Sequence, residues 1–237
     1  KIRNRLQDMD EDIFVQSDDR NRDGFKSLRE RADSYPELKA VNKGKSTDKD
    51  RFAAIACEKW IDVRSFGQVF AFSGGISVGV RGPVSLQAVS LSPIQVFNMQ
   101  IVKSVNSESK EGSEKSSDTM GMKHLVPFGL YLLKGSINCQ LAEKTGFSDE
   151  DAEKIKKAIL TLFENDASAA RPDGSMEVCR LYWWQHNCKE GQYSSATVHR
   201  SVRVTPKDGV VTPGDLTDYN ISVQPLDGLA CEEIYGI

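Results

Sequence analysis

The sequence predicts an α+β fold: a single domain over residues 1–237, built on an RRM-like (ferredoxin-like) β-α-β-β-α-β plan. Three observations support this. Residues 1–61 have a charged, helical pattern, β-rich runs follow them, and a strongly patterned helix comes after the third predicted strand. Helices and strands joined by long excursions are typical of α+β proteins. The first strand of the plan is missing from these residues, so we expect it in a preceding segment.

The N-terminal third is predicted to contain several short helices. Residues 1–6 resemble the interior of a helix, because no capping residue precedes them. Phe25, Leu28 and Ala32 recur at intervals of three and four, and residues 51–61 show a similar pattern.

Two β-rich runs, residues 63–72 and 80–91, enclose a Gly/Ser loop and are predicted to be strands. Arg64 and Arg81 stand near the starts of the two runs, and Pro83 suits a strand edge or a bulge. A flexible loop with cations at its base fits two kinds of site. One binds a phosphate backbone, and the other carries a nucleophile at the tip of the loop.

The second half of the chain is predicted to contain further strands and one strong helix. Strands are expected at 95–104, 124–143, 177–184, 197–204 and 219–225, with a mobile Ser/Glu/Lys loop at 105–120. The sequence from Ser148 to Asp151 is a helix-capping pattern, and apolar residues with helical spacing follow it. We therefore expect a helix at about 148–166.

Composition indicates a globular protein without a membrane span. Apolar residues make up 39% of the chain and charged residues 27%, and no apolar run approaches the roughly 18–20 residues that a span needs. The net charge is −3, but residues 205–237 contain one Lys and six Asp or Glu. The rest of the chain is slightly basic, so an electropositive groove is compatible with the sequence. The five widely spaced cysteines suggest reduced thiols and a cytoplasmic protein.

Two catalytic or metal-binding patterns are present but incomplete. Residues 75–79 match G-x-S-x-G, yet a nucleophile elbow needs a helix directly after Ser77, and the following residues predict a strand. Cys179, His186, Cys188 and His199 lack the close ligand pairs of structural zinc sites. We therefore expect no catalytic residue, no metal and no cofactor.

One segment resembles a strand that binds RNA. Residues 64–71 agree with the RNP1 pattern of RRM domains at four of eight positions: Arg64, Phe66, Gly67 and Val69. Phe66, Phe70 and Phe72 would share one face of such a strand. They could pack in the core, or Phe66 could stack on a base.

Four ordered segments together resemble one family. They are DVRSFGQVF, VRGPVSLQAVSLSPI, MGMKHLVPFGLYLLKGSI and FENDASAARPDGSMEVCRLYWWQHN. They are similar to the backbone subunit of the subtype I-C CRISPR surveillance complex, Cascade. The resemblance covers most of residues 50–200, and residues 1–4 resemble the family's first helix.

The resemblance implies an RRM-like palm, a helical finger region at 10–61 and a β-hairpin thumb at 95–123. It implies a non-catalytic protein whose copies stack head to tail along a CRISPR RNA (crRNA). The spacer bases then pair with target DNA, and other Cascade subunits complete the assembly.

The resemblance also implies which residues contact RNA. These are Lys1, Arg3, Arg64, Ser65, Phe66, Gly67, Gln68, Ser73, Gly74, Gly75, Arg81, Met120, Met122, Lys123 and His124. The alternative function is an RRM-like endoribonuclease that processes CRISPR RNA, with His124 or His199 as the general base.

Overall fold

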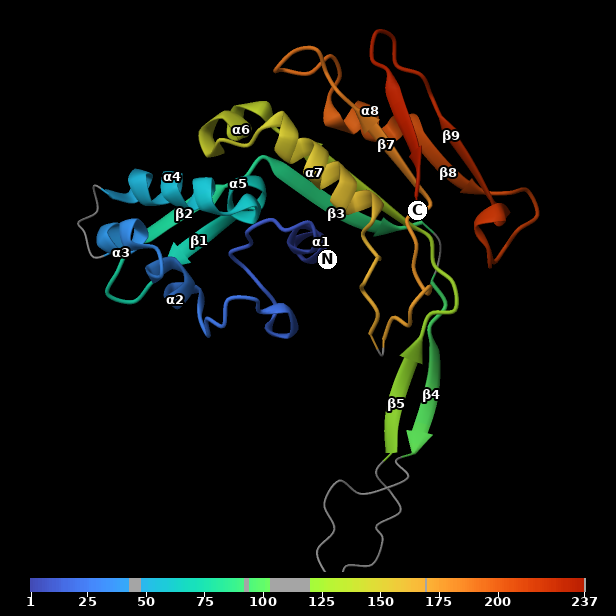
Figure 1. Cartoon of the computed structure of the whole chain (residues 1–237). Helices are drawn as coiled ribbons and strands as arrows, with labels where there is room; N and C mark the ends of the chain where they lie inside the picture. The colour runs from blue at the N-terminus through green and yellow to red at the C-terminus, as the bar shows by residue number, and fades with distance from the viewer. Residues whose placement is uncertain (43–47, 92–93, 103–119, 169, 237) are drawn as a thin grey trace, which may run out of the picture. The chain divides into compact units, whose positions relative to one another are not determined.

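The computed structural model describes residues 1–42, 48–91, 94–102, 120–168 and 170–236 (Figure 1). Helices and small antiparallel sheets occur together, which confirms the α+β class. The helices are α1 (Ile2–Asp8), η1 (Asp18–Arg20), α2 (Leu28–Asp33), α3 (Pro36–Asn42), α4 (Lys49–Lys59), α5 (Ile61–Phe66), α6 (Cys139–Thr145), α7 (Asp149–Leu160), α8 (Ser195–Ser201) and η3 (Leu216–Asp218).

The described strands form five two-stranded sheets: β1 with β2, β3 with β6, β4 with β5, β7 with β10 and β8 with β9. Their bounds are β1 (Gly67–Ala71), β2 (Ser77–Arg81), β3 (Val84–Ser90), β4 (Phe97–Val102), β5 (Met120–Leu125), β6 (Tyr131–Ile137), β7 (Arg180–Trp184), β8 (Val202–Pro206), β9 (Tyr219–Val223) and β10 (Cys231–Tyr235). Most of the loop predicted at 105–120 lies outside the described residues.

The helix predicted at 148–166 is present as α7, but it is shorter than expected. The Ser148 hydroxyl accepts a hydrogen bond from the Asp151 backbone N–H at 3.2 Å, and the Asp151 carboxylate accepts one from the Ser148 N–H at 3.0 Å. This capping box fixes the first turn. The helix ends at Leu160, and turns follow it.

The strand predicted at 63–72 is wrong in its first part, because residues 61–66 form α5. Helical spacing lets Ile61 and Val63 reach two different apolar clusters, and the buried Asp62 carboxylate accepts the backbone N–H of Phe14 at 2.8 Å. These tertiary contacts override the β-branched composition. The strand begins only at Gly67.

Three other predicted strands are also partly wrong. The run 124–143 contains the end of β5, the strand β6 and the beginning of α6, because the Asn138 side chain accepts the Leu141 N–H and caps a helix there. The run 80–91 is divided between β2 and β3, because Gly82 and Pro83 interrupt the ladder there. The run 197–204 begins as α8, in which Val198 and Ser201 are both buried at a helical spacing of three, and it continues as β8.

The chain divides into two compact units. The first consists of residues 1–86, 135–195 and 225–237, and the second of residues 87–134 and 196–224. In the first unit, one core cluster packs α4 against the β1–β2 pair, with Phe52 and Phe70 ring centroids 5.0 Å apart (Figure 1). The other cluster packs α1 against α7 through Leu6 and Ile155.

The second unit contains the β4–β5 and β8–β9 pairs and α8. Phe128 and Tyr219 pack there with ring centroids 6.4 Å apart. Among the described residues of the whole chain, no helix is long and apolar enough to cross a membrane.

Candidate nucleic-acid interface

The β1–β2 pair has one face in the core and one face in solvent. Phe70 on the inner face is fully buried beneath α4. Val69 on the outer face is 70% exposed. Because paired residues on antiparallel strands project to the same side, Gly79, opposite Val69, and Arg81, opposite Gly67, belong to the outer face. We call Val69, Ala71, Ser77, Gly79 and Arg81 the outer face of the pair.

Arg81 is the cation of this outer face. Its side chain is exposed, and among the described residues it has no ion-pair partner. Ser77 and Gly79 on the same strand are small, and a Cβ placed on Gly79 would meet nothing within 4 Å. A free guanidinium beside small residues lets a phosphate backbone approach the strand closely.

The loop between β1 and β2 contains Ser73, Gly74 and Gly75, and neighbouring helices hold it. Arg29 donates a hydrogen bond to the Ser73 carbonyl at 2.8 Å, and the Asn42 side-chain oxygen accepts one from the Ile76 N–H at 3.1 Å. A Cβ on Gly75 would lie 2.5 Å from that oxygen, so only glycine fits there. The three loop residues are exposed, but the hydrogen bonds from Arg29 and to Asn42 hold the loop in place.

Arg64 does not lie on the outer face, which corrects the expected pairing of Arg64 with Arg81. It projects from α5, and its guanidinium forms a two-pronged ion pair with Asp151 of α7 at 2.9 and 2.7 Å. Burial by itself raises the pKa of the Asp151 carboxyl, but the bonds from Arg64 and the Ser148 N–H outweigh burial and lower it. Arg64 therefore has a structural partner.

The residues after Arg64 are also less available than expected. Ser65 is fully buried, and its hydroxyl has no hydrogen-bond partner among the described residues. Phe66 packs against the cluster of α1 and α7, with the Arg3 guanidinium 5.3 Å from its ring centre. Gly67 and Gln68 are half-buried at the start of β1. Phe66 thus packs, partly buried, against the edge of this core cluster.

The two cations expected on the first helix are both paired. Lys1 forms an ion pair with Asp166 and lies 5.3 Å from the centre of the Phe163 ring. Arg3 donates to Asp62 at 3.0 Å, and its side chain stays 36% exposed. To contact RNA, each of these side chains would have to share its charge between its own carboxylate partner and a phosphate.

The remaining candidate residues lie on the β4–β5 pair of the second unit. Lys123 and His124 are exposed, and His124 Nδ1 lies 2.6 Å from the Asn98 side-chain oxygen. Met122 is 60% exposed, and Met120 opens the strand. Lys123 pairs with Met99, so it shares a face with Phe97, Met99, Ile101 and Leu125, which are between 43% and 50% exposed.

The geometry disfavours the other chemistries considered from the sequence. The chain stays extended from Ser77 to Arg81, so no helix follows Ser77 as a nucleophile elbow requires. Burial raises the pKa of the Cys57 thiol to about 11, which keeps it protonated. Among the described residues, no group of three or more His, Cys, Asp or Glu side chains is placed to hold a metal ion.

Sequence reasoning missed Val69 as part of this interface, and it assigned Ser77 and Gly79 to the loop 73–79 that was expected against RNA, whereas both lie on β2. The signal was the alternation along residues 77–81, in which Val78 and Val80 face inward and the residues between them face outward. The register of the two strands was needed to add Val69 to the same face.

Arg81, an exposed cation, and the small residues of β2 give the outer face of the β1–β2 pair the features of a surface that a phosphate backbone can approach. The comparison with protein families agrees. The profile of CRISPR-associated protein Cas7 matches residues 1–224, so the chain belongs to that family. The Cas7 family forms the crRNA-binding backbone of type I Cascade, and its members are generally non-catalytic. A comparison with curated proteins gave no match.

Proposed function

We propose that this chain is a non-catalytic crRNA-binding backbone subunit of a type I-C Cascade. Its copies stack head to tail along the crRNA and leave the spacer bases free to pair with target DNA. The observation that carries the proposal is Arg81 on the outer face of the β1–β2 pair, an exposed cation without an ion-pair partner in the described part of this Cas7-family chain. The assignment to subtype I-C rests on the four ordered sequence segments.

The proposed grip is independent of base sequence. In the first unit Arg81 neutralises a phosphate and Gly79 lets the backbone approach. In the second unit Lys123 of the β4–β5 pair offers a separate cation. The exposed Phe97, Met99 and Ile101 give that pair an apolar face that can separate stacked bases.

The net charge of −3 is tolerable because the copies share one RNA. Each copy needs only a few phosphate contacts, since its neighbours hold the same strand and raise its effective concentration there. The RRM-like plan, the finger at 10–61, the thumb at 95–123 and a cytoplasmic location remain predictions.

The test is to titrate purified protein onto crRNAs whose spacers differ in length, and to count bound copies by native mass spectrometry. We expect the number of copies to rise in steps with spacer length and the RNA to remain intact without added metal. A constant stoichiometry of one would contradict the filament. Site-specific cleavage that is lost in His124→Ala or His199→Ala would favour the endoribonuclease instead.

A further inference from the structure

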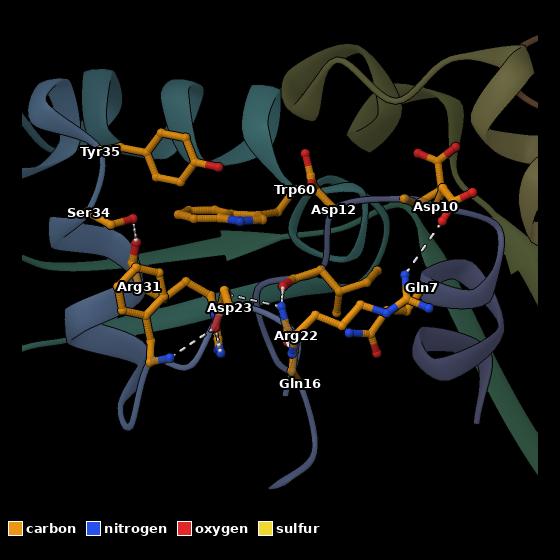
Figure 2. A pocket seen from close by; sticks show the side chains of 13 residues that line it. Gln7, Asp10, Asp12, Gln16, Arg22, Asp23, Arg31, Ser34, Tyr35 and Trp60 are labelled. Carbon is orange, nitrogen blue, oxygen red and sulfur yellow. Dashed lines mark hydrogen bonds and ion pairs between the residues drawn. The ribbon is translucent and has the colours of Figure 1, made fainter. Parts of the chain in front are cut away.

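A cavity of about 240 Å³ lies in the first unit, away from the outer face of the β1–β2 pair (Figure 2). Its walls come from the end of α1, the segments 10–13 and 16–25, and the junction of α2 with α3. It holds no residue of the proposed RNA interface. It therefore needs an explanation of its own.

One wall of this cavity is aromatic. Tyr35 meets Trp60 edge to face, with ring centroids 5.4 Å apart, and Trp60 is only 2% exposed. Figure 2 shows the Tyr35 hydroxyl pointing along the Trp60 ring toward Asp12. Among the described residues, none accepts a hydrogen bond from the indole N–H of Trp60, although the ring lines the cavity. This N–H is not fully enclosed, so it is open to the cavity and can donate a hydrogen bond to a ligand there.

The cavity lining is also acidic, and one of its carboxylates, Asp12, lies near the aromatic wall (Figure 2). Asp23 is held by the Arg31 guanidinium at 2.6 and 2.8 Å, and Glu11 pairs with Lys154 at 2.8 Å. Asp12 is exposed and has no ion-pair partner among the described residues. Burial raises the pKa of the Tyr35 hydroxyl, and the negative field of Asp12 raises it further. The Lys59 ammonium, 5.5 Å from the centre of the Tyr35 ring, lowers that pKa, so charges of both signs act on the aromatic wall.

Size and charge together define the ligand. The cavity is smaller than the roughly 300–1,000 Å³ of most small-molecule pockets, and its lining has four carboxylates against two guanidinium groups. A nucleotide is therefore disfavoured by both its bulk and its phosphate. A single flat cation suits the free carboxylate and the aromatic wall, as guanidinium groups do when they stack on rings.

We propose that this cavity receives an arginine side chain from a partner protein. The guanidinium donates hydrogen bonds to the Asp12 carboxylate and the Tyr35 hydroxyl oxygen. A backbone carbonyl beside that arginine accepts the hydrogen bond of the Trp60 indole N–H. The cavity is thus a protein-contact site on a subunit whose other surface contacts RNA.

The test is a titration of RNA-free protein with N-acetyl-arginine methylamide, followed through the ¹⁵N–¹H resonance of the Trp60 indole. That resonance is assigned with Trp60→Phe. We expect a saturable shift with the arginine probe. The neutral isostere N-acetyl-citrulline methylamide should give none.

Two mild substitutions test the contacts. Asp12→Asn should weaken binding of the probe about tenfold, because it removes a charge-assisted hydrogen bond. Tyr35→Phe keeps the ring and should weaken binding severalfold. The matched control is Asp50→Asn, an exposed acid on α4 outside the cavity, which should bind as the wild type does.

Three results would overturn the proposal: no saturable shift, equal binding of the citrulline probe, or unchanged affinity in Asp12→Asn. The titration contains no RNA, so its outcome is independent of the RNA-binding proposal.

Discussion

Arg64 and Arg81 are separated by one hairpin in the sequence, yet they have different roles. Arg64 bonds through both prongs of its guanidinium to Asp151, and its side chain is 17% exposed. Arg81 is exposed, with no ion-pair partner among the described residues. Arg64 projects from the helix α5 toward α7, whereas Arg81 projects from the strand β2 into solvent.

Replacing Arg64 should destabilise the fold. Arg64→Gln leaves the Asp151 carboxylate buried without its cation, which costs about 3 kcal/mol by analogy with other buried pairs. Urea unfolding of the free protein measures this difference. Arg81→Gln is the matched control and should change the free energy of unfolding by less than about 0.5 kcal/mol. Equal stability of the two variants would show that the Arg64 ion pair does not matter.

The same ion pair should make stability depend on pH. The pKa of Asp151 in the folded protein lies below its ordinary value of 3.8, so its carboxylate stabilises the fold at neutral pH. That contribution should decline below about pH 4 and vanish as the pH falls through the folded pKa. The wild type should therefore exceed Asp151→Asn in unfolding free energy at pH 7, and this excess should shrink steadily as the pH falls below about 4. A difference that stays constant with pH would rule this out, and Asp50→Asn serves as the exposed control.

Residue types alone identified some exposed residues of the candidate interface. Arg81 and the glycine loop were predicted from the sequence, and they lie on an exposed surface. The sequence did not distinguish Arg64, Ser65 and Phe66 from these exposed residues. Their burial depends on α1 and α7, which are far away in the chain. The local sequence around Arg64 gives no sign that its partner, Asp151, lies 87 residues further along the chain.

At the scale of elements, Gly67 determines where α5 ends and β1 begins. Its φ of 79° and ψ of 169° lie in a region that essentially only glycine occupies. A Cβ there would also lie 2.3 Å from the Val80 carbonyl oxygen on the neighbouring strand. The β1–β2 pair can follow the helix directly only because this residue has no side chain.

Gly67→Ala should therefore destabilise the protein by more than about 1 kcal/mol, from backbone strain and the clash with Val80. Thermal unfolding followed by circular dichroism measures the loss. Gly79→Ala on the partner strand is the control, because its Cβ would enter open space. An unchanged melting temperature for Gly67→Ala would mean that this turn can rearrange.

Elements with strong local signals were predicted well. The capping box of α7 and the alternation of β4 specify those elements without help from the rest of the chain. The helix α5 and the helix α8 were mistaken for strands, since their β-branched residues are held in helical form by tertiary packing.

At the scale of the whole molecule, charge has to be reconciled with RNA binding. The net charge is −3, and residues 205–237 contribute most of the acidity. Lys1, Arg3 and Arg64 are all neutralised by carboxylates, so few cations remain for phosphates. The account therefore predicts weak binding by one copy and tight binding by many copies on one RNA.

The salt dependence of crRNA binding in Arg81→Gln tests this account most directly. Because one phosphate contact per copy is lost, the slope of log K against log [salt] should fall by about 0.7 per protomer, equally for all spacer sequences. The matched control is Arg51→Gln, an exposed arginine of α4, the helix that covers the opposite face of the β1–β2 pair. Its slope should equal that of the wild type. A slope unchanged in Arg81→Gln, or a loss of affinity that depends on the base sequence, would contradict the proposed grip on the RNA backbone.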